Sequence, residues 1–271
     1  MKVGIVGIGN MGSKYVNKFR ELRLDYVLID SDRSKFENFP EDVPKYTDLS
    51  KALSKESITH LFVATSPQSH VPVAKLGINE GVNVMVEKPP ALDTKSLSEV
   101  IELAQKKGVQ FAVSEIELLS NSIQNLQKND GWERGEGFRL NLGKGYINPF
   151  YDLAWHDMYI FHYLFGSFRI ESIKEESSIV SLDVRNDSIE FSLQVAWLHP
   201  YLKRQWHLYS SEEETILNFV EDTIYYGDGR MKERDGVDKL KLMIENFLGN
   251  PSSDSSIRAF EILKEFEKIS R

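Results

Sequence analysis

The sequence predicts an α/β protein in which a doubly wound parallel sheet is followed by an α+β domain. Three observations lead to this expectation. Short apolar runs alternate with amphipathic helical stretches through roughly the first hundred residues, which is typical of a parallel sheet covered by helices. A glycine-rich turn follows the first apolar run. After residue 115 the pattern changes to long runs that alternate like antiparallel strands.

The chain has 271 residues, which is enough for two domains of roughly 100–200 residues each. We expect one domain over residues 1–116 and a second domain over residues 117–271. Charged residues make up 27% of the chain, and no apolar run approaches the ~18 residues of a membrane span. These features predict a soluble protein.

The rest of the composition limits where the protein is expected to be located and which partners it is expected to bind. The chain opens directly on the strand-like "MKVGIVGIG", unlike a signal peptide, and it contains no cysteine, which fits a reducing cytoplasm. Without cysteine there is no disulfide framework, thiolate nucleophile or cysteine metal site. A net charge of −8 argues against a nucleic-acid or anionic-membrane surface.

Expected elements of the first domain follow from periodicity. The predicted strands are Lys2–Val6, Asp25–Ile29, Lys45–Tyr46, His60–Ala64, Val82–Val86 and Val109–Val113. The predicted helices between them are Met11–Leu22, Asp48–Lys55, Val71–Glu80 and Thr94–Lys107. The second domain is expected to combine antiparallel strands, one central helix in "YDLAWHDMYIFHYLFG", and two closing helices at Asp238–Leu248 and Ile257–Ile269.

The turn after the first strand reads G-x-G-x-x-G and opens a helix. Its glycines permit a tight turn, close approach of backbone to a pyrophosphate, and packing of helix on strand. We therefore expect nicotinamide dinucleotide binding at Gly7, Gly9, Asn10, Met11 and Gly12. The alternative is an ordinary strand–helix turn.

An acidic residue stands about 20 positions further on, where the second strand ends at Asp30. Its carboxylate would accept hydrogen bonds from the adenosine ribose, and its charge, with that of Asp32, would repel a 2′-phosphate. NAD is therefore favoured over NADP. Arg33 and Lys35 lie within reach of the same pocket and could tolerate the phosphate of NADP.

Polar residues also follow the fourth predicted strand. Ligands of doubly wound sheets bind outside the carboxyl ends of strands, so Thr65, Ser66, Pro67 and Gln68 are expected to line the cofactor ribose and nicotinamide. The alternative is a plain Ser-Pro turn in which Ser69 caps the next helix.

Lys88 lies at the same edge, one strand further on. Pro89 restricts the conformation of Lys88, and an X-Pro bond at such a turn can be cis. A lysine held in this way near a nicotinamide could donate to a substrate hydroxyl and stabilise developing alkoxide character. Glu87, beside it, is expected on the nicotinamide side of the pocket.

The central helix carries a second catalytic candidate. Asp152 and His156 are four residues apart, so both lie on one face of a helix, where the carboxylate can orient the imidazole. His156 could then act as general base for an alcohol proton. The alternative is a structural Asp–His hydrogen bond. A metal site is not expected, because Asp157 and His162 point ~100° and about 120° away from His156 around the helix.

Together, G-x-G-x-x-G, "ATSPQSH", "GVNVMVEKPPAL" and "YDLAWHD" resemble the Gfo/Idh/MocA family of glucose-fructose oxidoreductase and inositol dehydrogenase. The resemblance covers essentially the whole chain. It implies a Rossmann domain followed by a domain with a large open sheet, a nicotinamide cofactor, sugar or polyol substrates, and a homodimer or homotetramer. It also implies catalytic roles for the lysine of E-K-P and for D-x-x-x-H, which correspond to Lys88, Asp152 and His156.

The chain departs from the family pattern at several positions. Leu118 and Leu119 stand where many members have Arg-Phe or Arg-Tyr, and Tyr159 stands where an Asp often follows the histidine. Lys144 and Arg139 are candidates for substrate contact, with an exposed strand charge as the simpler interpretation.

These residues predict an NAD(P)-dependent oxidoreductase that acts on a secondary alcohol or ketone of a sugar, polyol or related small molecule. Two alternatives stay open. One is a regulatory protein that senses nicotinamide without turnover. The other is a glycosidase-like enzyme that oxidises and re-reduces its substrate on tightly held NAD.

Overall fold

The computed structural model describes residues 1–126, 131–143, 145, 148–232, 236–249 and 252–269. The chain divides into two compact units. Unit 1 comprises Met1–Ser114 with Leu240–Phe260, and unit 2 comprises Glu115–Lys239 with Glu261–Arg271. In contrast to a single break near residue 116, residues from the C-terminal region therefore belong to both units. The Lys144 side chain lies outside the described residues.

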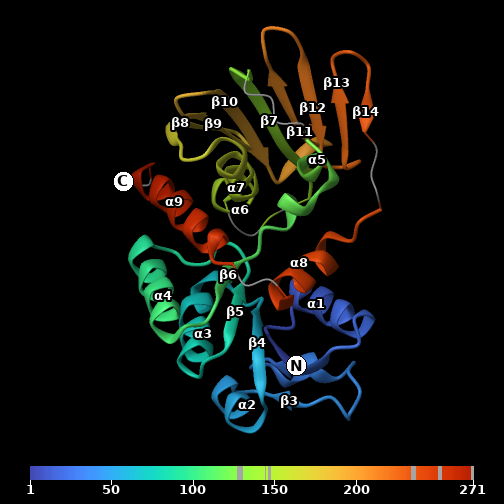
Figure 1. The fold of residues 1–271 in the computed structure, drawn as a ribbon, viewed down its shortest axis with the longest axis vertical. Helices are drawn as coiled ribbons and strands as arrows, with labels where there is room; N and C mark the ends of the chain where they lie inside the picture. The colour runs from blue at the N-terminus through green and yellow to red at the C-terminus, as the bar shows by residue number, and fades with distance from the viewer. Residues whose placement is uncertain (127–130, 144, 146–147, 233–235, 250–251, 270–271) are drawn as a thin grey trace. The chain divides into compact units, whose positions relative to one another are not determined.

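Unit 1 contains, within its described residues, a six-stranded parallel sheet in the order β3-β2-β1-β4-β5-β6 (Figure 1). This order is that of a Rossmann fold, with the chain reversing direction across the sheet between β1 and β4. Its strands are β1 Lys2–Val6, β2 Asp25–Ile29, β3 Lys45–Tyr46, β4 Ile58–Val63, β5 Asn83–Val86 and β6 Phe111–Val113.

Helices cover both faces of this sheet. Leu61 and Phe62 are consecutive residues of β4, so their side chains point to opposite faces. Tyr15 and Phe247 both pack on Phe62, whereas the helix carrying Gly77 approaches Leu61. The helices on the Phe62 face are α1 Asn10–Glu21 and α8 Lys239–Gly249; the Leu61 face carries α3 Pro67–Asn79, beside which α4 Thr94–Lys107 packs. A short helix α2, Leu49–Lys55, and a 3-10 turn, η1 Arg33–Phe36, complete the connections.

Local sequence explains where these helices begin and end. Asp93 caps α4, because its carboxylate accepts the Ser96 backbone N–H at 2.7 Å. Gly108 ends α4 in the left-handed conformation at φ +67°. In α3 the start differs from the predicted Val71: the helix begins at Pro67, which fits the first helical position because it has no N–H to leave unpaired. Pro72 lies inside α3 without ending it.

Unit 2 contains, in its described part, an eight-stranded sheet in the order β14-β13-β12-β11-β7-β10-β9-β8. Its neighbouring strands are antiparallel except for β7 and β10. The strands are β7 Arg134–Leu142, β8 Arg169–Glu176, β9 Ile179–Arg185, β10 Glu190–Ala196, β11 Leu198–Tyr209, β12 Glu214–Asn218, β13 Thr223–Tyr226 and β14 Met231–Lys232. A parallel six-stranded sheet and a separate, mostly antiparallel sheet confirm the predicted fold class.

Aromatic side chains join the helices of unit 2 to its sheet and to one another. Phe161 of α7 packs against Phe191 of β10, and Trp155 and Phe150 pack against Phe266. All five side chains are at least nine-tenths buried. The helices involved are α6 Pro149–Asp152, α7 Ala154–Phe165 and α9 Asp254–Ile269, whose residues from Glu261 onward belong to unit 2. Two short helices, η2 Ile116–Leu119 and α5 Asn121–Gln124, lie at the start of the unit.

Candidate functional site

The glycine loop forms the link between β1 and α1. Gly7 adopts φ +88°, which only glycine takes without strain, and a Cβ on Gly12 would lie 1.9 Å from the Gly7 carbonyl oxygen. A Cβ on Gly9, in contrast, would meet no atom within 4 Å. Helix α1 begins at Asn10 with no side-chain cap and no acidic residue in its first turn. The helix start therefore offers backbone N–H groups and open space to a phosphate.

Asp30 stands at the end of β2 and holds this loop. Its carboxylate accepts the backbone N–H of Ile8 at 2.7 Å through Oδ2 and that of Asp32 at 2.9 Å through Oδ1. The predicted ribose acceptor thus also fixes the backbone between Gly7 and Gly9. A carboxylate has about four acceptor sites, so these two bonds leave capacity for hydroxyl groups.

Thr65 and Ser66 follow β4, while Pro67 and Gln68 form the first turn of α3. Ser66, and not Ser69, is the N-cap residue of this helix, so the alternative in which Ser69 caps it is wrong. Within the helix, buried His70 lies 3.0 Å from the Thr65 carbonyl oxygen through Nε2 and 2.8 Å from the Pro89 carbonyl oxygen through Nδ1. His70 therefore joins the segments that follow β4 and β5. Burial lowers the pKa of His70, even though both carbonyl contacts act in the opposite direction.

Glu87 and Lys88 follow β5, and both are half-buried. The Tyr15 hydroxyl, from α1, donates to Glu87 Oε1 at 2.7 Å. Burial and the adjacent Glu87 charge raise the pKa of Tyr15 well above its usual value, so the phenol stays protonated and can donate. The Lys88–Pro89 peptide bond is cis. Unit 1 thus gathers the glycine loop, Asp30, Glu87 and Lys88 at the carboxyl ends of its parallel strands.

Asp152 and His156 belong to unit 2. The single helix predicted around them is two helices: Asp152 ends α6, Leu153 follows, and His156 lies in the first turn of α7. His156 Nδ1 lies 2.9 Å from the hydroxyl oxygen of Tyr159, and this oxygen also accepts the backbone N–H of Glu117 at 3.1 Å. Tyr159 is fully buried, so its position is fixed by packing as well as by these bonds.

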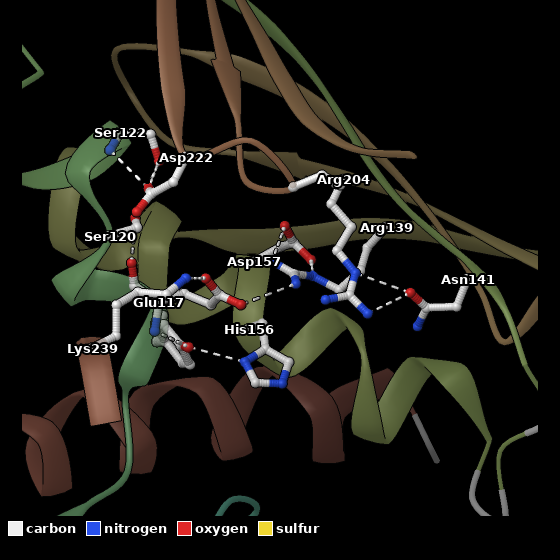
Figure 2. A network of polar contacts seen from close by, with 12 residues as sticks. Glu117, Ser120, Ser122, Arg139, Asn141, His156, Asp157, Arg204, Asp222 and Lys239 are labelled. Carbon is white, nitrogen blue, oxygen red and sulfur yellow. Dashed lines mark hydrogen bonds and ion pairs between the residues drawn. The ribbon is translucent and has the colours of Figure 1, made fainter. Parts of the chain in front are cut away.

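A cluster of buried charged side chains includes Asp157, the residue that follows His156 in the chain (Figure 2). Arg139 Nε donates to Asp157 Oδ2 at 2.6 Å, and Trp206 Nε1 donates to Asp157 Oδ1 at 2.8 Å. Glu117 Oε1 lies 3.7 Å from Arg139 Nη1, and Glu117 Oε2 lies 2.9 Å from Lys239 Nζ. Arg139 is only 2% exposed, so its interpretation as an exposed strand charge is wrong; it is a buried partner of Asp157.

The charged groups in this cluster shift the pKa values of Glu117 and Arg139. Burial acts to raise the pKa of Glu117, but the positive charges of Arg139 and Lys239 outweigh it and hold the pKa below its usual value. For Arg139, burial opposes the charged form, yet the carboxylates of Asp157 and Glu117 raise its pKa. The Glu117 carboxylate and the Arg139 guanidinium therefore remain ionised near neutral pH.

Among the described residues, no group of three or more histidine, aspartate or glutamate side chains is arranged to hold a metal ion. No helix in the described part of the chain is long and apolar enough to span a membrane.

The sheet order of unit 1 and the geometry of its glycine loop define a Rossmann-type nucleotide-binding protein with a second, open-sheet unit. Residues 1–115 match the model of the family described as an oxidoreductase family with an NAD-binding Rossmann fold. Over this part, which is less than half of the chain, the sequence is similar to the Gfo/Idh/MocA oxidoreductase family. For residues 1–115, the resemblance expected from the sequence motifs is thereby confirmed.

Curated relatives align over the first part of the chain. Inositol 2-dehydrogenase of Corynebacterium glutamicum is 26% identical over 112 residues, which are 39% of this chain and 33% of that protein. UDP-N-acetylglucosamine 3-dehydrogenase of Acidithiobacillus ferrooxidans is 22% identical over 128 residues, which are 47% of this chain and 41% of that protein. The alignments therefore span about a third to two-fifths of these relatives.

The fold similarity extends further than the sequence similarity. A solved structure of the Acidithiobacillus ferrooxidans UDP-N-acetylglucosamine 3-dehydrogenase matches with a TM-score of 0.88 over 100% of this chain and 96% of that chain. Its sequence is 18% identical, so this match concerns the fold alone.

Proposed function

We propose that this protein is an NAD(P)-dependent oxidoreductase that transfers hydride between a nicotinamide cofactor and a secondary alcohol or ketone of a sugar, polyol or related small molecule. The glycine loop carries this proposal. Gly7 turns the chain, Gly12 brings α1 against it, and the open space at Gly9 leaves the helix start accessible to a pyrophosphate.

The residues present fit such a cofactor. The N–H groups of Asn10, Met11 and Gly12 would face the phosphates, and Asp30 would receive the adenosine ribose. Thr65, Ser66, Pro67, Gln68, Glu87 and Lys88 would line the remaining ribose and the nicotinamide. When bound, the nicotinamide ring supplies the hydride acceptor or donor.

The chain's own residues would handle the proton. In the oxidation direction, His156 Nε2 takes the proton of the substrate hydroxyl, which requires that Nδ1 carry hydrogen and donate to the Tyr159 oxygen. Lys88 donates to the substrate oxygen as negative charge develops on it. Asp152 supports the imidazolium that forms. In the reduction direction, His156 returns the proton.

We propose NAD as the preferred cofactor, because Asp30 is held by two backbone N–H groups at the place where a 2′-phosphate would sit. The dissociation constants of NADH and NADPH, measured by quenching of protein fluorescence, test this preference. Tighter binding of NADPH than of NADH would contradict it. The Asp30→Asn variant should bring the dissociation constants of NADH and NADPH closer together, because it removes the charge that repels the 2′-phosphate.

Three broader assignments belong to the same proposal. Residues 1–116 would hold the cofactor, and residues 117–271 would bind substrate and join subunits into a homodimer or homotetramer. A cytoplasmic location is supported by the absence of cysteine from the sequence. Sedimentation of the full chain measures the number of subunits.

An absorbance screen of reduced nicotinamide tests the activity. The protein is assayed with NAD and NADP against sugars, polyols and sugar acids, and in reverse with NADH or NADPH and the matching ketones. Net formation or consumption of reduced cofactor is expected with at least one compound. Co-purified NAD with no net formation of NADH would favour the glycosidase-like alternative, and cofactor binding without turnover would favour a regulatory protein.

A further inference from the structure

Among the residues that the structure describes, no carboxylate pairs with Arg204 of β11. Its side chain is half-buried, and its Nε and Nη2 donate to the amide oxygen of Asn141, at 3.0 and 2.7 Å. Within the described part of the chain, no Asp or Glu oxygen forms an ion pair with this guanidinium. Its Nη1 carries no hydrogen bond to a described residue. A half-buried cation that bonds only to a neutral amide is an unusual arrangement.

The surroundings of Arg204 make this cation more costly. Arg204 and Arg139 are direct partners in the antiparallel pairing of β11 with β7, and like charges in that position repel. Arg139 is compensated by Asp157, whereas Arg204 is not. Burial, followed by the charge of Arg139, lowers the pKa of Arg204, although Glu117 and Asp157 act in the opposite direction.

The orientation of Asn141 adds a second donor. A guanidinium has no acceptor atom, so Asn141 must turn its amide oxygen toward Arg204 and its NH2 group away. Asn141 is 5% exposed, and this NH2 group has no hydrogen-bond partner among the described residues. The unused groups of the pair, Arg204 Nη1 and Asn141 Nδ2, are thus donors only. Donors grouped beside an uncompensated positive charge suit a carboxylate or a phosphate.

Arg204 and Asn141 point to the same face of the sheet as Arg139, and Arg139 contacts α7 on that face. Figure 2 shows the side chains of Arg204, Asn141 and Arg139 extending from the sheet. Arg139 donates to Asp157, which follows His156 in α7. We propose that Arg204 and Asn141 form an anion subsite for the substrate. The substrate class would then be a sugar or polyol derivative that carries a carboxylate or phosphate. This inference rests on the proposed oxidoreductase function and names the chemistry of its substrate.

Equilibrium binding tests the subsite without requiring turnover. The full chain is titrated by calorimetry at constant ionic strength, with and without saturating NADH. Three probes are used: glucuronate for a carboxylate, UDP-N-acetylglucosamine for a phosphate-linked sugar, and methyl glucoside as the neutral reference. The protein variants are Arg204→Gln, Asn141→Asp, and Arg169→Gln as a matched control, because the Arg169 side chain is 65% exposed on the same sheet.

The unchanged protein should bind glucuronate or UDP-N-acetylglucosamine at least about tenfold more tightly than methyl glucoside, since hydrogen bonds to charged groups are the stronger ones. Which acidic probe binds tells a carboxylate substrate from a phosphate one. Arg204→Gln should remove the preference. Asn141→Asp should remove it too, because the new carboxylate would occupy Arg204. Arg169→Gln should leave it intact.

Thermal unfolding separates a binding role from a structural one. Both site variants should unfold at or above the temperature of the unchanged protein, because each relieves an uncompensated charge. Failure of both acidic probes to bind, equal binding to Arg204→Gln, or a lowered unfolding temperature in both variants would overturn the subsite. Failure of NADH to bind while the Arg204-dependent preference persists would instead contradict the proposed oxidoreductase function.

Discussion

The hydroxyl oxygen of Tyr159 lies 2.9 Å from Nδ1 of His156 and accepts the backbone N–H of Glu117 at 3.1 Å. Tyr159 therefore connects the first turn of α7 to the segment that begins unit 2. Because the tyrosine is fully buried and Glu117 is held by two cations, the imidazole has a fixed neighbour on its Nδ1 side. In the proposed mechanism, a histidine base held in this way would need less reorganisation during proton transfer.

Removing this hydroxyl should slow the reaction more than it weakens substrate binding. In Tyr159→Phe, Nδ1 of His156 loses its neighbour, and we expect kcat to fall about threefold to tenfold while KM changes little. Steady-state kinetics measure the two constants. Tyr163→Phe, on the same helix with a 39% exposed side chain, is the control. A change in KM alone would show that Tyr159 does not act through His156.

Two glycines of the same loop should respond differently to alanine. Gly12→Ala places a Cβ 1.9 Å from the Gly7 carbonyl oxygen, so α1 must move and the protein should lose stability, by about 1–3 kcal/mol as for other overpacked sites. At Gly9 the added Cβ meets no protein atom, so Gly9→Ala should unfold at the same temperature as the unchanged protein.

Cofactor binding distinguishes the two variants further. The methyl group of Gly9→Ala would occupy the space assigned to the pyrophosphate, so NADH should bind about tenfold or more weakly despite normal stability. Calorimetric titration with NADH measures this effect. Undiminished NADH affinity in Gly9→Ala would mean that the phosphates lie elsewhere.

The buried pair of Arg139 and Asp157 should be essential to the stability of unit 2. Asp157→Asn leaves Arg139 without its carboxylate at a position that is 2% exposed, and loss of one partner of a buried pair costs about 3–5 kcal/mol. Denaturant unfolding measures the difference in free energy. Asp228→Asn, in an exposed pair with Arg230, should change the free energy of unfolding by less than about 1 kcal/mol. Similar losses in both variants would contradict this ranking.

Local signals in the sequence predict much of unit 1. The bounds of β1, β2, β3 and α4 agree residue for residue with the expected ranges, because glycine, capping aspartate and clear apolar periodicity mark their ends. The start of α3 is missed, since "SPQS" has the composition of a turn and the predicted helix begins only at Val71. The assignment of Leu240–Phe260 to unit 1 is missed as well, because it depends on contacts between distant parts of the chain.

The residues of the candidate site also fall into two groups, those that the sequence predicts and those that only the structure brings together. The glycine loop, Asp30, Lys88 and His156 stand in motifs of fixed spacing, so the sequence predicts them as candidate site residues. Arg139 and Asp157 are 18 residues apart on a strand and a helix, and Arg204 is brought to Asn141 by strand pairing across 63 residues. No local pattern encodes these partners. The sequence pattern relates Asp157 only to a metal site, which it argues against. In the structure, Asp157 holds Arg139.

The central claim is that Lys88 takes part in hydride transfer on a bound nicotinamide. The most direct test compares Lys88→Ala with Lys95→Ala, an exposed lysine at the start of α4, using the best substrate found in the absorbance screen. Loss of the donor should reduce kcat/KM by about 100-fold to 10,000-fold, while the NADH dissociation constant stays within about threefold of the original. Lys95→Ala should retain full activity. Unchanged turnover in Lys88→Ala would contradict the account.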